Sequence, residues 1–329
     1  MTDQVERFPS ARADSDVEEA VTQSALDTMA RDDLDVLERE GLEIESLTQW
    51  QLTRRKFFQH KLAVGSLILL LIIILSSLFA EQLAPYPFDA PNVPDRSLAP
   101  TLTDNHFFGT DKIGRDYFSR TLYGTRTSIY VAFFVSFLST GIGVIVGGIA
   151  GYYGKWIDNL LMRVTDLFFT LPFLPVLMIL ANFWGRGNPI RVGIVLAFLF
   201  WTTLARIVRG EFLSLREKEY VEAAKALGAS DARIIFRHIL PNALGAIIVN
   251  ATLTVATAIL VEAALSFLGF GIQPPFPALG KLISDGQDAL TTQWWLAVFP
   301  GLTIVAIALC INFIGDGLRD ALDPKQRVK

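Results

Sequence analysis

Six long apolar stretches alternate with polar segments along this chain of 329 residues. They cover residues 62–80, 129–153, 160–184, 192–208, 243–270 and 295–314. At about 1.5 Å of rise per residue, each crosses or nearly crosses a hydrocarbon core of roughly 30 Å, although the fourth is short. Because backbone polar groups in lipid must be satisfied within the segment, the pattern predicts an all-α integral membrane protein with six transmembrane helices.

The composition agrees with a membrane protein. Hydrophobic residues make up 51% and charged residues 19%, with a mean hydropathy of +0.40, whereas a soluble protein carries about 25% charged residues. A soluble enzyme is therefore effectively excluded. With one cysteine and three dispersed histidines, neither an internal disulfide nor a dedicated metal site is expected.

The charge is unevenly distributed between the two parts of the chain. Residues 1–50 hold 14 acidic and 4 basic side chains, a net charge of −10, and the rest of the chain carries +6. We expect a largely disordered acidic tail over residues 1–50, with a plausible short helix at 25–42, and a membrane domain over residues 51–325. The tail either contacts a partner or stays solvated, as like-charged runs usually do.

The placement of lysine and arginine predicts the orientation. With the N-terminus inside, 17 basic residues of the membrane domain lie on the cytoplasmic side and 8 on the outer side. Six helices with both termini in the cytoplasm satisfy this bias. The expected location is the cell membrane, as a multi-pass protein in contact with the lipid bilayer.

The polar loop at about residues 211–242 has the signals of two short helices. Residues 217–227 are good helix formers, and Gly228 suits the left-handed position that ends a helix. Ser230 is a candidate N-cap for a second short helix, and Pro241 is tolerated in the first turn of the following membrane helix. The loop therefore predicts a helix–glycine–helix unit between two membrane segments.

The first of these short helices has a small face with one charge. Ala223 and Ala224 remove side-chain bulk where another protein's surface can approach, and Glu222 offers a charged contact beside them. A short helix of this kind suits a groove on a second protein. Inert packing is the alternative interpretation.

This loop resembles the EAA motif of ABC importer permeases. The residues that carry the resemblance are Glu222, Ala223, Ala224, Gly228, Leu240 and Pro241. The family usually has an apolar residue where this chain has His238, but the run at 237–242 is similar to the peptide-transporter branch. In that family the loop forms a coupling helix that docks into a cleft on the ATPase subunit.

Two other segments resemble dipeptide and oligopeptide permeases of the second-subunit type. They are FGTD with GRD at residues 108–116 and EAALSFLG with QPP at residues 262–275. The resemblance implies the fold of a type I ABC importer permease. It also implies a heterodimer with a second, homologous permease, two ABC ATPase subunits and an extracytoplasmic substrate-binding protein, with no nucleic acid as partner.

The chain has no sequence signature of an enzyme. No G-x-x-x-x-G-K-[ST] phosphate loop occurs, and residues 151–155 have the wrong spacing for one. No nucleophile–base pair is visible either. We expect a transport subunit without catalytic residues or a cofactor of its own, with ATP and Mg²⁺ bound by the partner ATPases.

Polar residues and prolines inside apolar runs are candidates for the pathway or for subunit contacts. Arg163 and Asp166 are three residues apart and can pair with each other. Pro172 and Pro175 are expected to kink the same helix, either to line a passage or simply as a packing kink.

Glu262 lies among small residues in the fifth apolar stretch. Because a carboxylate exposed to lipid is costly, it should face protein or water. The small neighbours favour contact with a partner subunit, and a place on the substrate path is the alternative.

These observations favour a permease subunit of an ATP-driven importer of dipeptides or oligopeptides. Related importers of nickel chelates or glutathione remain as alternatives for the substrate. The rival class is a secondary transporter or channel that needs no ATPase, and a membrane scaffold is a third. The loop at 211–242 discriminates among them, because a self-contained carrier has no obvious use for it.

Overall fold

The computed structural model describes residues 49–184 and 187–322, and regular structure in these residues is helical. The long helices are α3 (Lys61–Leu78), α5 (Tyr117–Tyr153), α8 (Pro189–Arg216), α11 (Leu240–Phe267) and α13 (Trp295–Leu322). Within the described residues, five helices are long and apolar enough to cross a membrane, or six if one bent pair forms a single span. Residues 1–48 of the predicted acidic tail, including the short helix expected at 25–42, lie outside the described residues.

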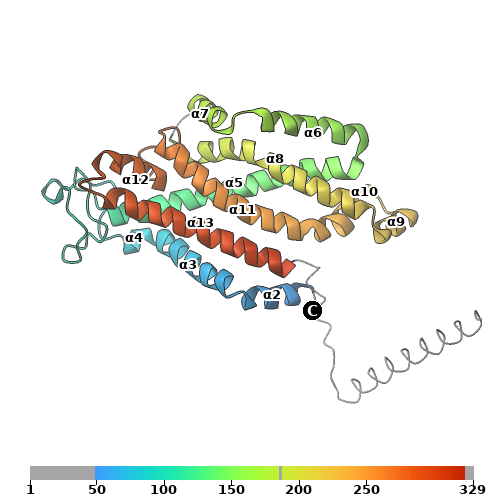
Figure 1. Ribbon diagram of the computed structural model, residues 1–329, viewed down its shortest axis with the longest axis horizontal. Helices are drawn as coiled ribbons and strands as arrows, with labels where there is room; N and C mark the ends of the chain where they lie inside the picture. The colour runs from blue at the N-terminus through green and yellow to red at the C-terminus, as the bar shows by residue number, and fades with distance from the viewer. Residues whose placement is uncertain (1–48, 185–186, 323–329) are drawn as a thin grey trace, which may run out of the picture. The chain divides into compact units, whose positions relative to one another are not determined.

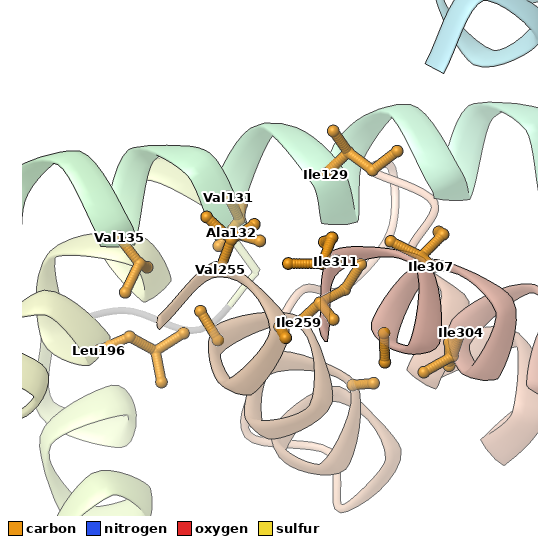
Figure 2. Close-up of a cluster of buried hydrophobic side chains, with 14 of the residues drawn as sticks. Ile129, Val131, Ala132, Val135, Leu196, Val255, Ile259, Ile304, Ile307 and Ile311 are labelled. Carbon is orange, nitrogen blue, oxygen red and sulfur yellow. The ribbon is translucent and has the colours of Figure 1, made fainter. Parts of the chain in front are cut away.

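The helices pack around a shared apolar core. α5 lies against α8 and α11, α11 lies against α13, and α13 lies against α3 (Figure 1). Figure 2 shows branched side chains of α5, α11 and α13, such as Val135, Ile259 and Ile307, meeting in this core. The short helices α2 (Gln49–Gln59) and α4 (Ala80–Leu83) precede and follow α3.

The contact between α5 and α8 depends on glycine. Gly143, Gly147 and Gly151 recur every fourth residue on α5 and lie against the backbone of α8 near Ala205 and Arg209. A Cβ atom built on Gly151 would lie 2.7 Å from the Arg209 carbonyl oxygen, so a larger residue does not fit without movement. Small residues at this spacing allow the two helix backbones to approach closely.

The third apolar stretch forms two helices rather than one. α6 (Lys155–Thr170) and α7 (Phe173–Trp184) are bent by 92° at the short break between them. The predicted kink is instead a break at Pro172, and Pro175 lies in the first turn of α7, where a proline is tolerated. Leu171 is extended, as the residue before a proline tends to be. Figure 1 shows α6 and α7 at the edge of the helices beside α8.

Three helix boundaries differ from the predictions. The helix that contains the apolar stretch 129–153 begins earlier, at Tyr117, where Asp116 caps α5 by accepting a hydrogen bond from the Ser119 N–H at 2.7 Å. α8 has 28 residues and is not short, since its polar last turns continue the helix beyond the apolar stretch. The fifth span runs without interruption from Asp231, because α10 (Asp231–Arg233) and π-helical η2 (Ile234–Ile239) lead directly into α11.

The polar segments lie at opposite ends of the long helices (Figure 1). One end holds the segment between α4 and α5, which contains η1 (Val93–Asp95), together with α12 (Leu279–Gly286) and η3 (Gln287–Ala289). His106 fastens this segment to α5, because its Nδ1 lies 2.9 Å from the Asp116 carboxylate and its ring stacks on Tyr86. The other end holds α9 (Glu219–Ala226) and α10.

Candidate functional site

The loop between α8 and α11 folds as a hook, which we define as residues 219–239. It comprises α9, a turn at Gly228, α10 and η2. Gly228 has a φ of +79°, and the Ala229 N–H donates to the Ala224 carbonyl at 3.0 Å, which closes the last turn of α9. The predicted helix–glycine–helix unit is confirmed. The predicted cap is wrong in one respect: Ser230 occupies the N-cap position but its exposed side chain makes no capping hydrogen bond.

The hook is held to the ends of the long helices by one buried face. Val221, Ile234 and Ile239 are buried in an apolar cluster with Tyr152 of α5 and Phe212 of α8. This cluster is separate from the core of Figure 2, so the hook has an apolar base of its own.

Hydrogen bonds add to this anchoring. The Tyr152 hydroxyl donates to the Asp231 carboxylate at 2.7 Å, which ties α10 to the end of α5. Arg216, the last residue of α8, donates to the carbonyls of Gly151 and Tyr152 at 3.3 and 3.1 Å. The hook is thus bonded to the end of α5, and the end of α5 is bonded in turn to the end of α8.

The opposite face of the hook is exposed and partly apolar. Glu222, Ala223 and Gly228 are exposed, and Ala224 is half-buried. Beside them, the side chains of Leu227 and Phe236 are 88% and 69% exposed. Sequence reasoning missed these two residues, although a leucine directly before the helix-ending glycine of a polar loop is the signal that points to Leu227. Exposed apolar side chains next to an alanine face are typical of a docking surface.

His238, Leu240 and Pro241 lie at the junction of the hook with α11, away from the small face of α9. In the π-helical turn, the Leu240 N–H bonds to the Ile235 carbonyl, five residues back. The wider turn leaves room for Pro241, which has no N–H to donate. The Asn242 side-chain amide donates to the His238 carbonyl at 2.6 Å. These residues shape the connection between hook and helix.

Asp166 of α6 pairs with a residue that is distant in the sequence. Its carboxylate accepts a hydrogen bond from Arg206 of α8 at 2.6 Å, rather than pairing with Arg163 on its own helix as expected. The reason is that α6 lies against α8, which brings the guanidinium within reach. Both side chains remain about half exposed, at 49% for Asp166 and 46% for Arg206.

Glu262 differs most from its predicted role. The carboxylate is completely buried, and it accepts hydrogen bonds from Ser266 at 2.6 Å and from Ser128 of α5 at 2.9 Å. Because no surface is left for a second chain or for substrate, the predicted subunit contact is incorrect for this conformation. Both serines also accept from backbone N–H groups, of Ile272 at 2.9 Å and Leu279 at 3.4 Å. Glu262 therefore holds the segment 272–279 against α5 and α11.

At the end of the long helices that holds α12, acidic residues form ion pairs. Asp111 accepts hydrogen bonds from the side chains of Arg115 and Arg120, at 2.7 and 3.1 Å. Arg120 also contacts Asp285 of α12 at 3.3 Å. Among the described residues, no group of three or more His, Cys, Asp or Glu side chains is placed to hold a metal ion.

Two family models match most of the chain. Residues 143–328 match the binding-protein-dependent transport system inner membrane component, and residues 48–100 match the N-terminal TM domain of oligopeptide transport permease C. The first match alone covers more than half of the chain and includes the hook.

Curated relatives are similar over most of the chain. The oligopeptide transport system permease protein OppC of Haemophilus influenzae is 43% identical over 88% of this chain and 92% of the relative. OppC of Escherichia coli K12 is 39% identical over 88% of this chain and 95% of the relative. The dipeptide transport system permease protein DppC of Bacillus subtilis is 40% identical over 88% of this chain and 90% of the relative.

One solved structure, an inward-facing form of the MetNI methionine ABC transporter, matches 61% of this chain and 94% of its own at 21% identity and a TM-score of 0.46. That likeness is too low to support any statement about this chain. The family models and the relatives at about 40% identity do not depend on it. This chain belongs to the family of binding-protein-dependent transport system inner membrane components, in the branch of the OppC-like permeases.

Proposed function

We propose that this chain is the permease subunit of an ATP-driven ABC importer that moves peptides across the cell membrane. Support comes from the family match and from relatives that are named oligopeptide or dipeptide transport permeases. These names favour a peptide over a nickel chelate or glutathione, the alternatives that the sequence left open.

The observation that carries the proposal is the hook. It is anchored by Val221, Ile234 and Ile239, and it exposes Leu227 next to the small face of α9. In the proposed mechanism, this exposed face docks on an ATPase subunit, and Glu222, Ala223, Ala224 and Gly228 form the contact. ATP and Mg²⁺ belong to the ATPases, and this chain needs no cofactor.

The proposed arrangement has six spans, with α6 and α7 counted as one, and both termini in the cytoplasm. The excess of lysine and arginine on the side of the hook supports this orientation. The described residues form one hook, whereas two ATPases acting together need two. We therefore propose a heterodimer with a second permease, two ATPases and an extracytoplasmic binding protein.

Transport would proceed by alternating access. ATP binding closes the ATPase pair, moves both hooks and opens the pathway outward, and hydrolysis restores the inward-facing state. The hook can transmit only the difference between its contacts with the ATPase in the two states. Its hydrogen bond to Tyr152 of α5 and its apolar packing on Phe212 of α8 provide the route to the membrane helices.

The test is a mild-detergent pull-down of the tagged chain from its native membrane, with mass spectrometry and an ATPase assay of the eluate. We expect a second permease and P-loop ATPases to co-purify, with ATPase activity. A chain that is recovered alone, stable and without ATPase activity would contradict the proposal and favour a carrier or channel.

A further inference from the structure

A cavity lies beside the break between α6 and α7. It has a volume of about 270 Å³ and is lined by both helices, by Phe200 and Thr203 of α8 and by Thr257 of α11. This is slightly below the roughly 300–1,000 Å³ of complete small-molecule sites. The cavity therefore suits one or two side chains of a larger ligand rather than the whole of it.

The ion pair of Asp166 and Arg206 borders this cavity. The Arg206 guanidinium lies over the ring of Phe169, 3.9 Å from its centroid, and Phe169 also lines the cavity. Arg206 lies two residues before the end of the apolar stretch at 192–208, on the side of the hook, and its guanidinium is held against this cavity by Asp166 and Phe169. The cavity, the aromatic ring and the ion pair form one continuous surface.

This surface carries charges among apolar side chains, since Leu167, Phe169 and Leu171 are also exposed. Two half-exposed charges on membrane-spanning helices are costly in a hydrocarbon environment, so they face water or protein. On α8 the exposed positions Thr203, Arg206 and Gly210 follow one stripe, and none of them is apolar and large. On α3, by contrast, exposed Ile68 and Ile72 present the apolar surface that lipid requires.

The broken helix supplies a second, independent observation. A helix end leaves the carbonyls of its last four residues without partners inside the helix. At the end of α6 the Thr170 hydroxyl donates a hydrogen bond to one of these carbonyls, that of Leu167, at 2.8 Å. Non-helical backbone at membrane depth is tolerated where it is buried in protein or lines a water-filled cavity, and this break borders a cavity.

We propose that this surface, comprising the cavity at the α6–α7 break and the Asp166–Arg206 pair, is part of the wall along which a peptide crosses the membrane. This inference rests on the proposed function and adds where the substrate is contacted. The phenylalanine rings take up apolar side chains of the peptide. The threonine hydroxyls and the open backbone of the break bind its main chain, and the ion pair offers both signs of charge to its termini.

The test uses thiol labelling of the assembled complex in proteoliposomes. Cys310 is the only cysteine of this chain and is buried, so Cys310→Ser gives the parent. Thr203→Cys then places a thiol on the proposed wall, and Ile72→Cys on α3 is the matched control on an apolar exposed face. The probe is a charged thiosulfonate that does not enter lipid, and labelling is read on this chain after the subunits are separated.

We expect Thr203→Cys to react much faster than Ile72→Cys. Its rate should fall several-fold when a transported tripeptide, its binding protein and ATP are added, compared with ATP and the unloaded binding protein. Thr203→Trp, which fills the cavity, should reduce uptake of a phenylalanine-containing tripeptide more than uptake of trialanine.

Two outcomes would overturn the inference while the parent still takes up peptide. They are no reaction at Thr203→Cys, and a reaction that peptide does not slow. If the parent complex with its ATPases takes up no peptide at all, the proposed function itself fails.

Discussion

Glu262 has no accessible surface, and both oxygens of its carboxylate are held by serine hydroxyls. Through Ser128 and Ser266 it organises two helices and the backbone of a segment that returns to the core at Ile272 and Leu279. A buried polar group of this kind stabilises only while every partner is present, because each unpaired group in the interior carries its full desolvation cost.

We expect Glu262→Ala to lower the free energy of unfolding by about 1–3 kcal/mol, because two buried hydroxyls lose their partner. Glu262→Gln should cost less, since an amide can still bond to both serines. Thermal unfolding of the purified complex measures this, and Asp104→Ala, which removes an exposed carboxylate, is the control. Equal midpoints for Glu262→Ala and Asp104→Ala would contradict the assigned role.

Gly228 is required for its backbone conformation and not because a larger side chain would collide with a neighbour. Its φ is +79°, and a Cβ atom built there meets nothing within 4 Å. We expect Gly228→Val to strain the hook by about 1–2 kcal/mol and to uncouple ATP hydrolysis from uptake, with insertion into the membrane unchanged. Gly65→Val, at a helical glycine that also has free space, is the control. Normal uptake by Gly228→Val at wild-type expression would argue against the coupling role.

At the scale of elements, the contact of α5 with α8 determines where the rest of the domain lies. Both helices contribute to the apolar core and to the base of the hook. The glycines on α5 permit this contact only because no side chain separates the two backbones.

Gly147 and Gly141 provide a matched pair on α5. A Cβ atom at Gly147 would collide with the Ala205 carbonyl oxygen and lie 2.9 Å from the Val208 Cβ, whereas one at Gly141 meets nothing within 4 Å. We expect Gly147→Val to destabilise the domain by about 1–3 kcal/mol through overpacking, and Gly141→Val to be close to neutral. The melting temperatures of the two purified variants test this, and a similar decrease for both would refute the packing argument.

At the scale of the whole molecule, the hook and the segment before α5 lie at opposite ends of the same helices. In the proposed importer, the first end faces the ATPases and the second faces the binding protein. Leu227 and Leu102 are both strongly exposed leucines, one at each end, and so distinguish the two surfaces.

We expect Leu227→Asp, and likewise Ala224→Asp, to reduce co-purification of the ATPases and to abolish uptake, because a charge is introduced into the docking face. Leu102→Asp should leave co-purification unchanged. Quantitative mass spectrometry of the pulled-down complexes provides the measurement. Full recovery of the ATPases with Leu227→Asp would show that the hook is not part of the interface with the ATPases.

The sequence by itself located the long apolar helices and the hook, and its motifs indicated the family that the comparisons show. Helices in lipid must satisfy their own backbone within about 20 apolar residues, so the hydropathy pattern is sufficient to find them. Gly228 similarly marks the end of α9, because few other residues adopt a positive φ. The break at Pro172 follows from the same local rules, which involve only neighbours in the chain.

Only the tertiary structure decided which side chains meet. Asp166 pairs with Arg206, 40 residues away, and Glu262 with Ser128, 134 residues away. Such contacts depend on the rotation of each helix about its axis, which is fixed by packing against neighbours and has no local signature. The same reason explains why Leu227 is exposed while Val221, six residues earlier, is buried: the cluster beneath the hook selects which face of α9 turns inward.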